Sequence, residues 1–142
     1  MVKRKLIGIA VAGFHAGLAN SMLAAALDEA KKQGLAVGAV YRVPGAFELP
    51  LAAKHLFDNG VDGVVALGVV IKGGTNHDEL VAGNAARKLA DLSLEYKKPV
   101  GLGVIGPGVS KEQARVRAEP SARGAVRAVK VMLGVLSSGL GE

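Results

Sequence analysis

The sequence of 142 residues contains no cysteine and no tryptophan, and only three phenylalanines and two tyrosines. The lack of cysteine excludes disulfide bonds, a thiolate nucleophile and any metal site built on cysteine. No apolar run approaches the roughly 20 residues that a membrane-spanning helix requires, and the N-terminus lacks the layout of a signal peptide. We therefore expect an intracellular, cytoplasmic protein with no membrane partner, and the length predicts a single domain over residues 1–142.

The chain carries 18 basic and 12 acidic residues, a formal net charge of +6. Such an excess suits either nucleic acid or anionic small molecules as partners. Because the basic residues are dispersed and no nucleic-acid-binding motif accompanies them, we favour small anionic molecules and expect no nucleic acid partner. Half of the residues are hydrophobic and the mean hydropathy is +0.33, which favours apolar surface hidden between subunits.

Short apolar runs alternate along the chain with segments of helical spacing. The apolar runs predict strands over 5–12, 36–42, 61–71 and 99–105. The helical spacing predicts helices over 17–33, over 47–59, from a Thr75 or Asn76 cap to about residue 96, and from 110 onward. Ser110 followed by Gln113 is a capping-box pattern, and Pro120 predicts a kink or break in the last helix. Four strands alternating with four helices indicate a flavodoxin-like three-layer α/β/α sandwich around a four-stranded parallel sheet.

Ligands of such folds bind at the carboxyl ends of the strands, and the segment KGGTNHDE at 72–79 follows the third strand. Its glycines expose backbone amides at a helix N-terminus, which favours an anion such as phosphate, although an ordinary capped loop has the same pattern. His77 on the first turn could transfer protons near neutral pH or be structural. Asp78 and Glu79 point around the helix rather than converging, so no metal site is expected.

Two further segments at that edge of the sheet carry aromatic side chains. In VPGAFELP at 43–50, Glu48 could bind hydroxyl groups, or Phe47 could be core and Glu48 could only favour the helix N-terminus. Phe14, just after the first strand, could stack on a flat heterocycle or plug the sheet edge. Composition and spacing leave both alternatives open.

Three segments in one order resemble the lumazine synthase family: VPGAFELP at 43–50, ALGVVIKGGTNHDE at 66–79 and NAARKLADLSLEYKKPVGLGVIGPG at 84–108. The second and third are especially similar to archaeal members. The resemblance implies an enzyme of riboflavin biosynthesis that condenses 5-amino-6-(D-ribitylamino)uracil with 3,4-dihydroxy-2-butanone 4-phosphate. The products would be 6,7-dimethyl-8-ribityllumazine, inorganic phosphate and water, formed without a cofactor in a homo-oligomer built from pentamers.

The resemblance also implies roles for individual residues. His77 matches the proton-transfer residue of the family, Phe14 resembles the aromatic residue that stacks on the pyrimidine, and Arg117 matches a phosphate-binding arginine. The other substrate-binding positions are Ala46, Phe47 and Glu48 for the ribityl chain, Val70 and Ile71 for the ring, Gly74 and Thr75 for the phosphate, and Leu102, where phenylalanine is frequent. In family members, the positions of Leu102 and Arg117 belong to the neighbouring subunit.

The sequence departs from the family pattern at several positions near the site. His15 stands in place of the usual asparagine, Gly13 in place of a common charged residue, and Gly74 in place of a larger one. Arg115 is a second candidate for the phosphate ligand, because the alignment with Arg117 needs one extra residue. The alternative function is a non-catalytic flavin- or phosphate-binding protein on the same scaffold, and a basic nucleic-acid binder has only the charge in its favour.

Overall fold

The computed structural model describes residues 4–140. Within them it has four strands and four α-helices in alternation, in the predicted order. The strands are β1 (Leu6–Ala12), β2 (Ala36–Val43), β3 (Gly63–Ile71) and β4 (Val100–Val109). The helices are α1 (Ala16–Lys32), α2 (Leu49–Asp58), α3 (His77–Tyr96) and α4 (Lys111–Ser137), and a 3₁₀ turn, η1 (Ala46–Glu48), leads into α2. No helix in the described part of the chain is long and apolar enough to cross a membrane.

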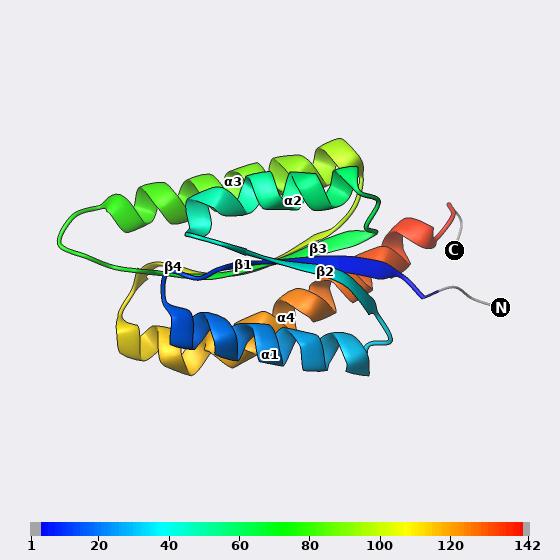
Figure 1. Ribbon diagram of the computed structural model, residues 1–142. Coiled ribbons are helices and arrows are strands. Elements are labelled where there is room, and N and C mark those ends of the chain that lie inside the picture. The colour runs from blue at the N-terminus through cyan, green and yellow to red at the C-terminus, as the bar shows by residue number, and fades with distance from the viewer. Residues whose placement is uncertain (1–3, 141–142) are drawn as a thin grey trace.

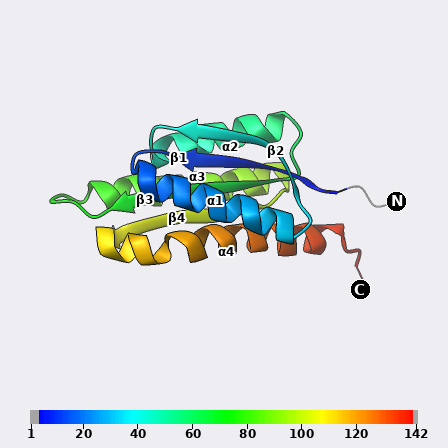
Figure 2. The same ribbon diagram turned by 60° about the horizontal axis from the view of Figure 1, so that its bottom comes forward.

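The four strands form one parallel sheet in the order β2-β1-β3-β4. Helices α2 and α3 cover one face of this sheet and α1 and α4 cover the other (Figure 1). Figure 2 shows α1 and α4 side by side on their face. The predicted flavodoxin-like three-layer α/β/α sandwich is therefore confirmed.

The central strand β1 divides its side chains between two apolar cores. Ile7, Ile9 and Val11 pack with α1 and α4, whereas Ala10 and Ala12 pack with α2 and α3. Successive side chains of a strand point to opposite faces, so a strand covered on both sides must be apolar at every position. This is the physical reason why β1 and β3 appear in the sequence as unbroken apolar runs, whereas the outermost strand β2 is largely exposed and contains Arg42.

Helix α4 begins as the sequence predicts. The Ser110 hydroxyl accepts a hydrogen bond from the Gln113 backbone N–H at 3.1 Å, and the Gln113 side-chain oxygen accepts one from the Ser110 N–H at 2.9 Å. The predicted break at Pro120 does not occur, because α4 continues through it to Ser137. Pro120 is exposed, while Ala118 and other small residues of the opposite face are buried against the sheet. That packing keeps the helix continuous across the backbone hydrogen bond that proline removes.

Strand β4 extends past residue 105, where the sequence analysis ends it. Its pairing with β3 continues to Ile71 and Val109, because the turn at 106–108 keeps close to β3. Gly106 has a φ of 116°, and a Cβ on it would lie 2.3 Å from the Val70 carbonyl oxygen. Only glycine fits there.

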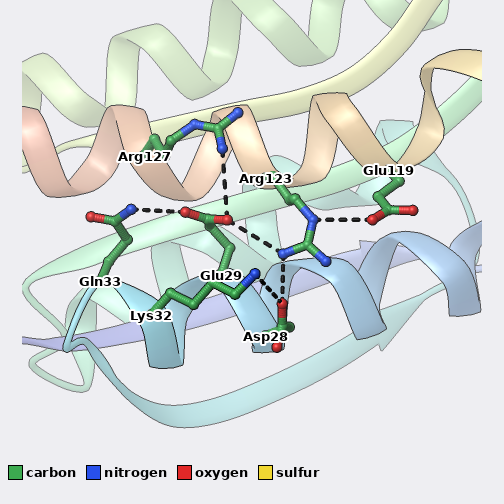
Figure 3. Close-up of polar contacts among 7 residues, drawn as sticks. All are labelled: Asp28, Glu29, Lys32, Gln33, Glu119, Arg123 and Arg127. Atoms are coloured by element: carbon green, nitrogen blue, oxygen red, sulfur yellow. Dashed lines mark hydrogen bonds and ion pairs between the residues drawn. The ribbon is translucent and has the colours of Figure 1, made fainter.

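Charged side chains join the neighbouring helices α1 and α4 (Figure 3). The Arg123 guanidinium lies 2.7 Å from the Asp28 carboxylate, 3.3 Å from Glu29 and 3.1 Å from Glu119. The Arg123 hydrogen bond lowers the pKa of Asp28, and a hydrogen bond from Gln33 is the main cause of a lowered pKa at Glu29. These contacts fix α4, which carries Arg117, against the body of the protein.

Candidate functional site

The connections from strands to helices lie at one end of the sheet, on the left in Figure 1. Those that follow β1, β2 and β3 border a cavity of about 550 Å³. This is the edge formed by the carboxyl ends of the strands, where parallel sheets bind ligands. The residues of the predicted site that line the cavity are Phe14, Ala46, Phe47, Glu48, Val70, Ile71, Thr75 and His77. Gly74, Leu102 and Arg117 do not line it.

Two exposed aromatic rings border the cavity. The side chains of Phe14 and Phe47 are 79% and 61% exposed, whereas the third phenylalanine of the chain, Phe57, is buried and stacks on Tyr96. Exposed phenylalanine rings are unfavourable in water unless a ligand or another protein surface covers them. Two of only three phenylalanines therefore lie where a flat apolar group could stack.

Glu48 stabilises the turn that presents Phe47. Its Oε1 atom accepts a hydrogen bond from the Gly45 backbone N–H at 2.9 Å, which closes the turn between β2 and α2. Ala46 beside it is buried and anchors this turn in the core between the sheet and α2. The half-buried carboxylate thus has a fixed position at the cavity and can accept hydrogen bonds from hydroxyl groups.

The loop between β3 and α3 projects from the body of the protein (Figure 1), and its residues 72–76 are all exposed. Asn76 is the N-cap of α3 but its side chain makes no capping hydrogen bond, whereas the Thr75 hydroxyl accepts one from the His77 N–H at 3.4 Å. The start of α3 therefore presents backbone N–H groups, a hydroxyl and an imidazole on the cavity side. This arrangement suits an anion.

The charge of the cavity lining is nevertheless unfavourable for an anion. Glu48 and Asp78 supply two carboxylates, and no lysine or arginine among residues 4–140 lines the cavity. His15 and His77 are the lining side chains that can become cationic. A phosphate held here would need a permanent cation from another place.

The two predicted positions on β4 and α4 lie apart from the cavity. Leu102 is 49% exposed on β4, the outermost strand on one side of the sheet. Arg117 lies about two turns into α4, and its exposed side chain makes no ion pair or hydrogen bond within the part of the chain that the structure describes. Arg115 is engaged instead, at 3.4 Å from the Glu112 carboxylate.

Several cavity residues were not predicted as site residues. Gly45 and Gly73 lie inside the motifs quoted above, next to predicted positions, and His15 was noted only as a departure. Val81 follows His77 by four positions, so helical spacing could have identified it as a residue on the same face. Asp78 was considered only as a metal ligand, yet it is buried and lines the cavity. Within residues 4–140 no three metal-ligating side chains gather.

Comparison with known proteins gives one consistent result. Residues 4–137 match the family described as 6,7-dimethyl-8-ribityllumazine synthase. A protein of that name from Staphylothermus marinus is 52% identical over 89% of this chain and 85% of its own length, and one from Metallosphaera sedula is 50% identical over 88% and 84%. A third, from Picrophilus torridus, is 46% identical over 93% of this chain and 97% of its own length. The chain therefore belongs to the 6,7-dimethyl-8-ribityllumazine synthase family of transferases, the enzymes of riboflavin biosynthesis to which its motifs were similar.

Proposed function

We propose that this chain condenses 5-amino-6-(D-ribitylamino)uracil with 3,4-dihydroxy-2-butanone 4-phosphate to give 6,7-dimethyl-8-ribityllumazine, phosphate and water. The observation that carries the proposal is the cavity at the carboxyl edge of the sheet, which brings together Phe14, Phe47, Glu48 and His77 from three separate segments. The proposal takes residues 1–142 as one cytoplasmic domain that uses no cofactor and has no nucleic acid or membrane partner.

The chemistry requires placement and proton transfer only. The pyrimidine amine attacks the ketone and forms an imine with loss of one water. Phosphate is eliminated and leaves an enol, which tautomerises to a carbonyl. The second nitrogen attacks this carbonyl and closes the ring with loss of a second water. Orientation of two reactants and a positioned acid–base group can supply such catalysis. In this proposal Phe14 stacks on the pyrimidine, with Val70 and Ile71 at the ring edge, and His77 moves protons to and from the reacting atoms.

In this proposal the polyol and the phosphate occupy neighbouring parts of the cavity. Glu48, held by the Gly45 N–H, accepts hydrogen bonds from the ribityl hydroxyls beside Ala46 and Phe47. The phosphate lies at the start of α3, where Gly74, Thr75 and backbone N–H groups of the loop and first turn receive it. His77, on the same turn, is within reach of the leaving phosphate.

The lack of a lysine or arginine in the cavity lining of residues 4–140 favours a site completed by a second chain. A doubly charged phosphate next to Glu48 and Asp78 needs an arginine, and no arginine among residues 4–140 lines the cavity. We propose that Arg117 of a neighbouring subunit supplies it, with Leu102 covering the exposed aromatic rings, in a homo-oligomer built from pentamers. The free Arg117 side chain is better suited to this role than Arg115, which already pairs with Glu112.

The test of the activity is direct. Purified protein is mixed with both substrates, and the fluorescence of the lumazine and the release of phosphate are followed together. Equal amounts of the two products are expected. A folded protein that binds phosphate but forms no lumazine would support the non-catalytic alternative.

The shared site is tested by mixing two impaired variants, His77→Ala and Arg117→Ala, which are unfolded and refolded together. At equal proportions about a quarter of the interfaces in randomly assembled rings pair an intact His77 face with an intact Arg117 face. Activity above the average of the separately refolded variants is expected. If mixed rings form and the activity stays at that average, both residues act within one chain.

A further inference from the structure

Asp78 is a buried carboxylate that the proposed reaction does not use. It is the second residue of α3, its side chain is 5% exposed, and it lines the cavity. One of its oxygens, Oδ2, accepts a hydrogen bond from the Gly108 backbone N–H at 2.9 Å. No lysine, arginine or histidine within residues 4–140 forms an ion pair with it. A buried charge without a cation is costly, so its partner on the β4 turn is the feature to explain.

The turn that Asp78 contacts is Gly106-Pro107-Gly108, in which proline fixes only its own φ and the two glycines are left without a conformational preference. Gly106 and Gly108 have φ angles of 116° and 79°, in the region that favours glycine. Because glycine populates many backbone conformations, this turn needs an external contact to hold one of them. The close approach of Gly106 to Val70 and the pairing of Val109 with β3 hold the two ends of this segment. The Asp78 carboxylate adds a hydrogen bond to Gly108 between them.

The position of Asp78 works against anion binding. The dipole of α3 stabilises a carboxylate on its first turn, but the same helix end is proposed to hold the phosphate. Electrostatics alone therefore makes Asp78 a competitor of the phosphate, and removing its charge would strengthen phosphate binding. Its presence indicates a contribution of another kind, which its hydrogen bond to Gly108 identifies.

We propose that Asp78 is a positioning residue that fixes the 106–108 turn against the start of α3 and so sets the path of the chain into α4. Ser110 caps α4 directly after this turn, and Arg117 follows about two turns later. This inference rests on the proposed function, in which Arg117 serves the cavity of the neighbouring chain. Asp78 then links the start of α3, which borders the cavity of its own chain, to α4, whose Arg117 is proposed to complete the cavity of the neighbouring chain.

The experiment compares three variants of the assembled protein, with inorganic phosphate as the probe and titration calorimetry as the measurement. Asp78→Ala removes both the charge and the hydrogen-bond acceptor. Asp78→Asn removes the charge but keeps an oxygen that can accept from Gly108. Glu79→Ala is the matched control, because Glu79 lies on the same helical turn with the same charge but is exposed and outside the cavity lining.

A positioning role and a purely electrostatic role of Asp78 predict opposite changes in the phosphate affinity of Asp78→Ala. We expect Asp78→Ala to bind phosphate about 10-fold more weakly, since misplacement of a binding group by about 1 Å has effects of this size or larger. Asp78→Asn should bind phosphate at least as tightly as the unaltered protein, and Glu79→Ala should differ little from it. Phosphate binding by Asp78→Ala that equals or exceeds that of the unaltered protein overturns the proposal, as does an Asp78→Asn variant that is as weak as Asp78→Ala.

Amide hydrogen exchange gives a second measurement that does not depend on turnover. The Gly108 amide should exchange slowly in the unaltered protein and in Asp78→Asn, and rapidly in Asp78→Ala. If Asp78→Ala does not fold, Asp78→Ser replaces it, because the serine side chain is too short to reach Gly108. Rapid exchange at Gly108 in the unaltered protein also overturns the proposal. Failure of the proposed function is a different result, namely absence of lumazine, which neither phosphate affinity nor exchange requires.

Discussion

The packing of α4 on β4 is closest at Gly101, and the structure predicts what a single methyl group there would do. A Cβ at Gly101 would lie 2.2 Å from the Ala125 carbonyl oxygen, 2.8 Å from its carbon and 2.9 Å from a Val129 methyl carbon. A carbon and a carbonyl oxygen in contact are normally about 3.3 Å apart or more, so α4 would have to move by about 1 Å. Backbone atoms of a buried helix cannot turn away as a flexible side chain can.

The expected cost follows from these distances. Overpacking of a buried site costs about 1–3 kcal/mol, and the backbone contact places Gly101→Ala in the upper half of that range. The intrinsic gain from replacing glycine in a strand, about 0.5–1 kcal/mol, offsets only part of it. We expect Gly101→Ala to lower the free energy of unfolding by about 1–2.5 kcal/mol after this offset.

Gly83 is the matched control for this substitution. It lies on the exposed side of α3, and a Cβ there would meet no heavy atom within 4 Å. Gly83→Ala should therefore stabilise the protein by about 0.5–1 kcal/mol through helix propensity. Urea unfolding of both variants at one protein concentration gives the midpoints and slopes. Equal midpoints for Gly101→Ala and the unaltered protein, with equal slopes, would refute the close packing of α4 on β4.

Three further predictions concern the proposed site and the Arg123 contacts that join α4 to α1. His77→Ala should lower kcat by about 10²–10⁴-fold in steady-state assays with little change in pyrimidine affinity, because solvent replaces a proton-transfer group only in part. Inorganic phosphate should compete with the keto-phosphate in inhibition assays. Arg117→Ala should lower the affinity for both compounds more than Arg115→Ala does, and the reverse order would assign the role to Arg115. Arg123→Met should destabilise the protein at pH 7, and the difference in urea midpoints should shrink below about pH 4. The reason is that a lowered pKa at Asp28 contributes stability above the unfolded-state pKa, which is lost as the pH falls through the folded-state value.

The fold followed from the sequence because its signals are local. Each strand is a predominantly apolar run of its own, interrupted in β2 only by Arg42. Each helix has its own spacing or end signals, such as the Ser110 and Gln113 capping box. Of the kink or break expected at Pro120, the break does not occur, for the converse reason. Whether a helix survives a proline depends on how firmly its other face is packed, and the alanines that hold α4 on the sheet meet partners distant in sequence.

The cavity residues also divide into those that local sequence signals could predict and those that depend on contacts between distant segments. Phe14, Phe47 and His77 stand in motifs directly after strands, and a parallel sheet brings such segments to one edge, so their meeting could be predicted. The contact between Asp78 and Gly108 could not, since it spans 30 positions and involves a backbone N–H that no sequence pattern marks.

The composition of the cavity is the strongest indication that one chain is only part of the proposed site. Phe14 and Phe47 leave most of their surface uncovered, and the two carboxylates in the lining meet no lysine or arginine from residues 4–140. An isolated chain would hold a phosphate there against Glu48 and Asp78 with backbone N–H groups and imidazoles alone. Charge-assisted hydrogen bonds from a guanidinium are about twice as strong as neutral ones, so an arginine from a second chain changes both the affinity and the net charge of the site. The free side chain of Arg117 and the exposed Leu102 lie on the β4 and α4 side of the same molecule. Within residues 4–140 the cavity has no lysine or arginine in its lining and leaves two aromatic rings exposed, while Arg117 and Leu102 are exposed elsewhere on the same molecule. These features suit the proposed assembly of identical chains.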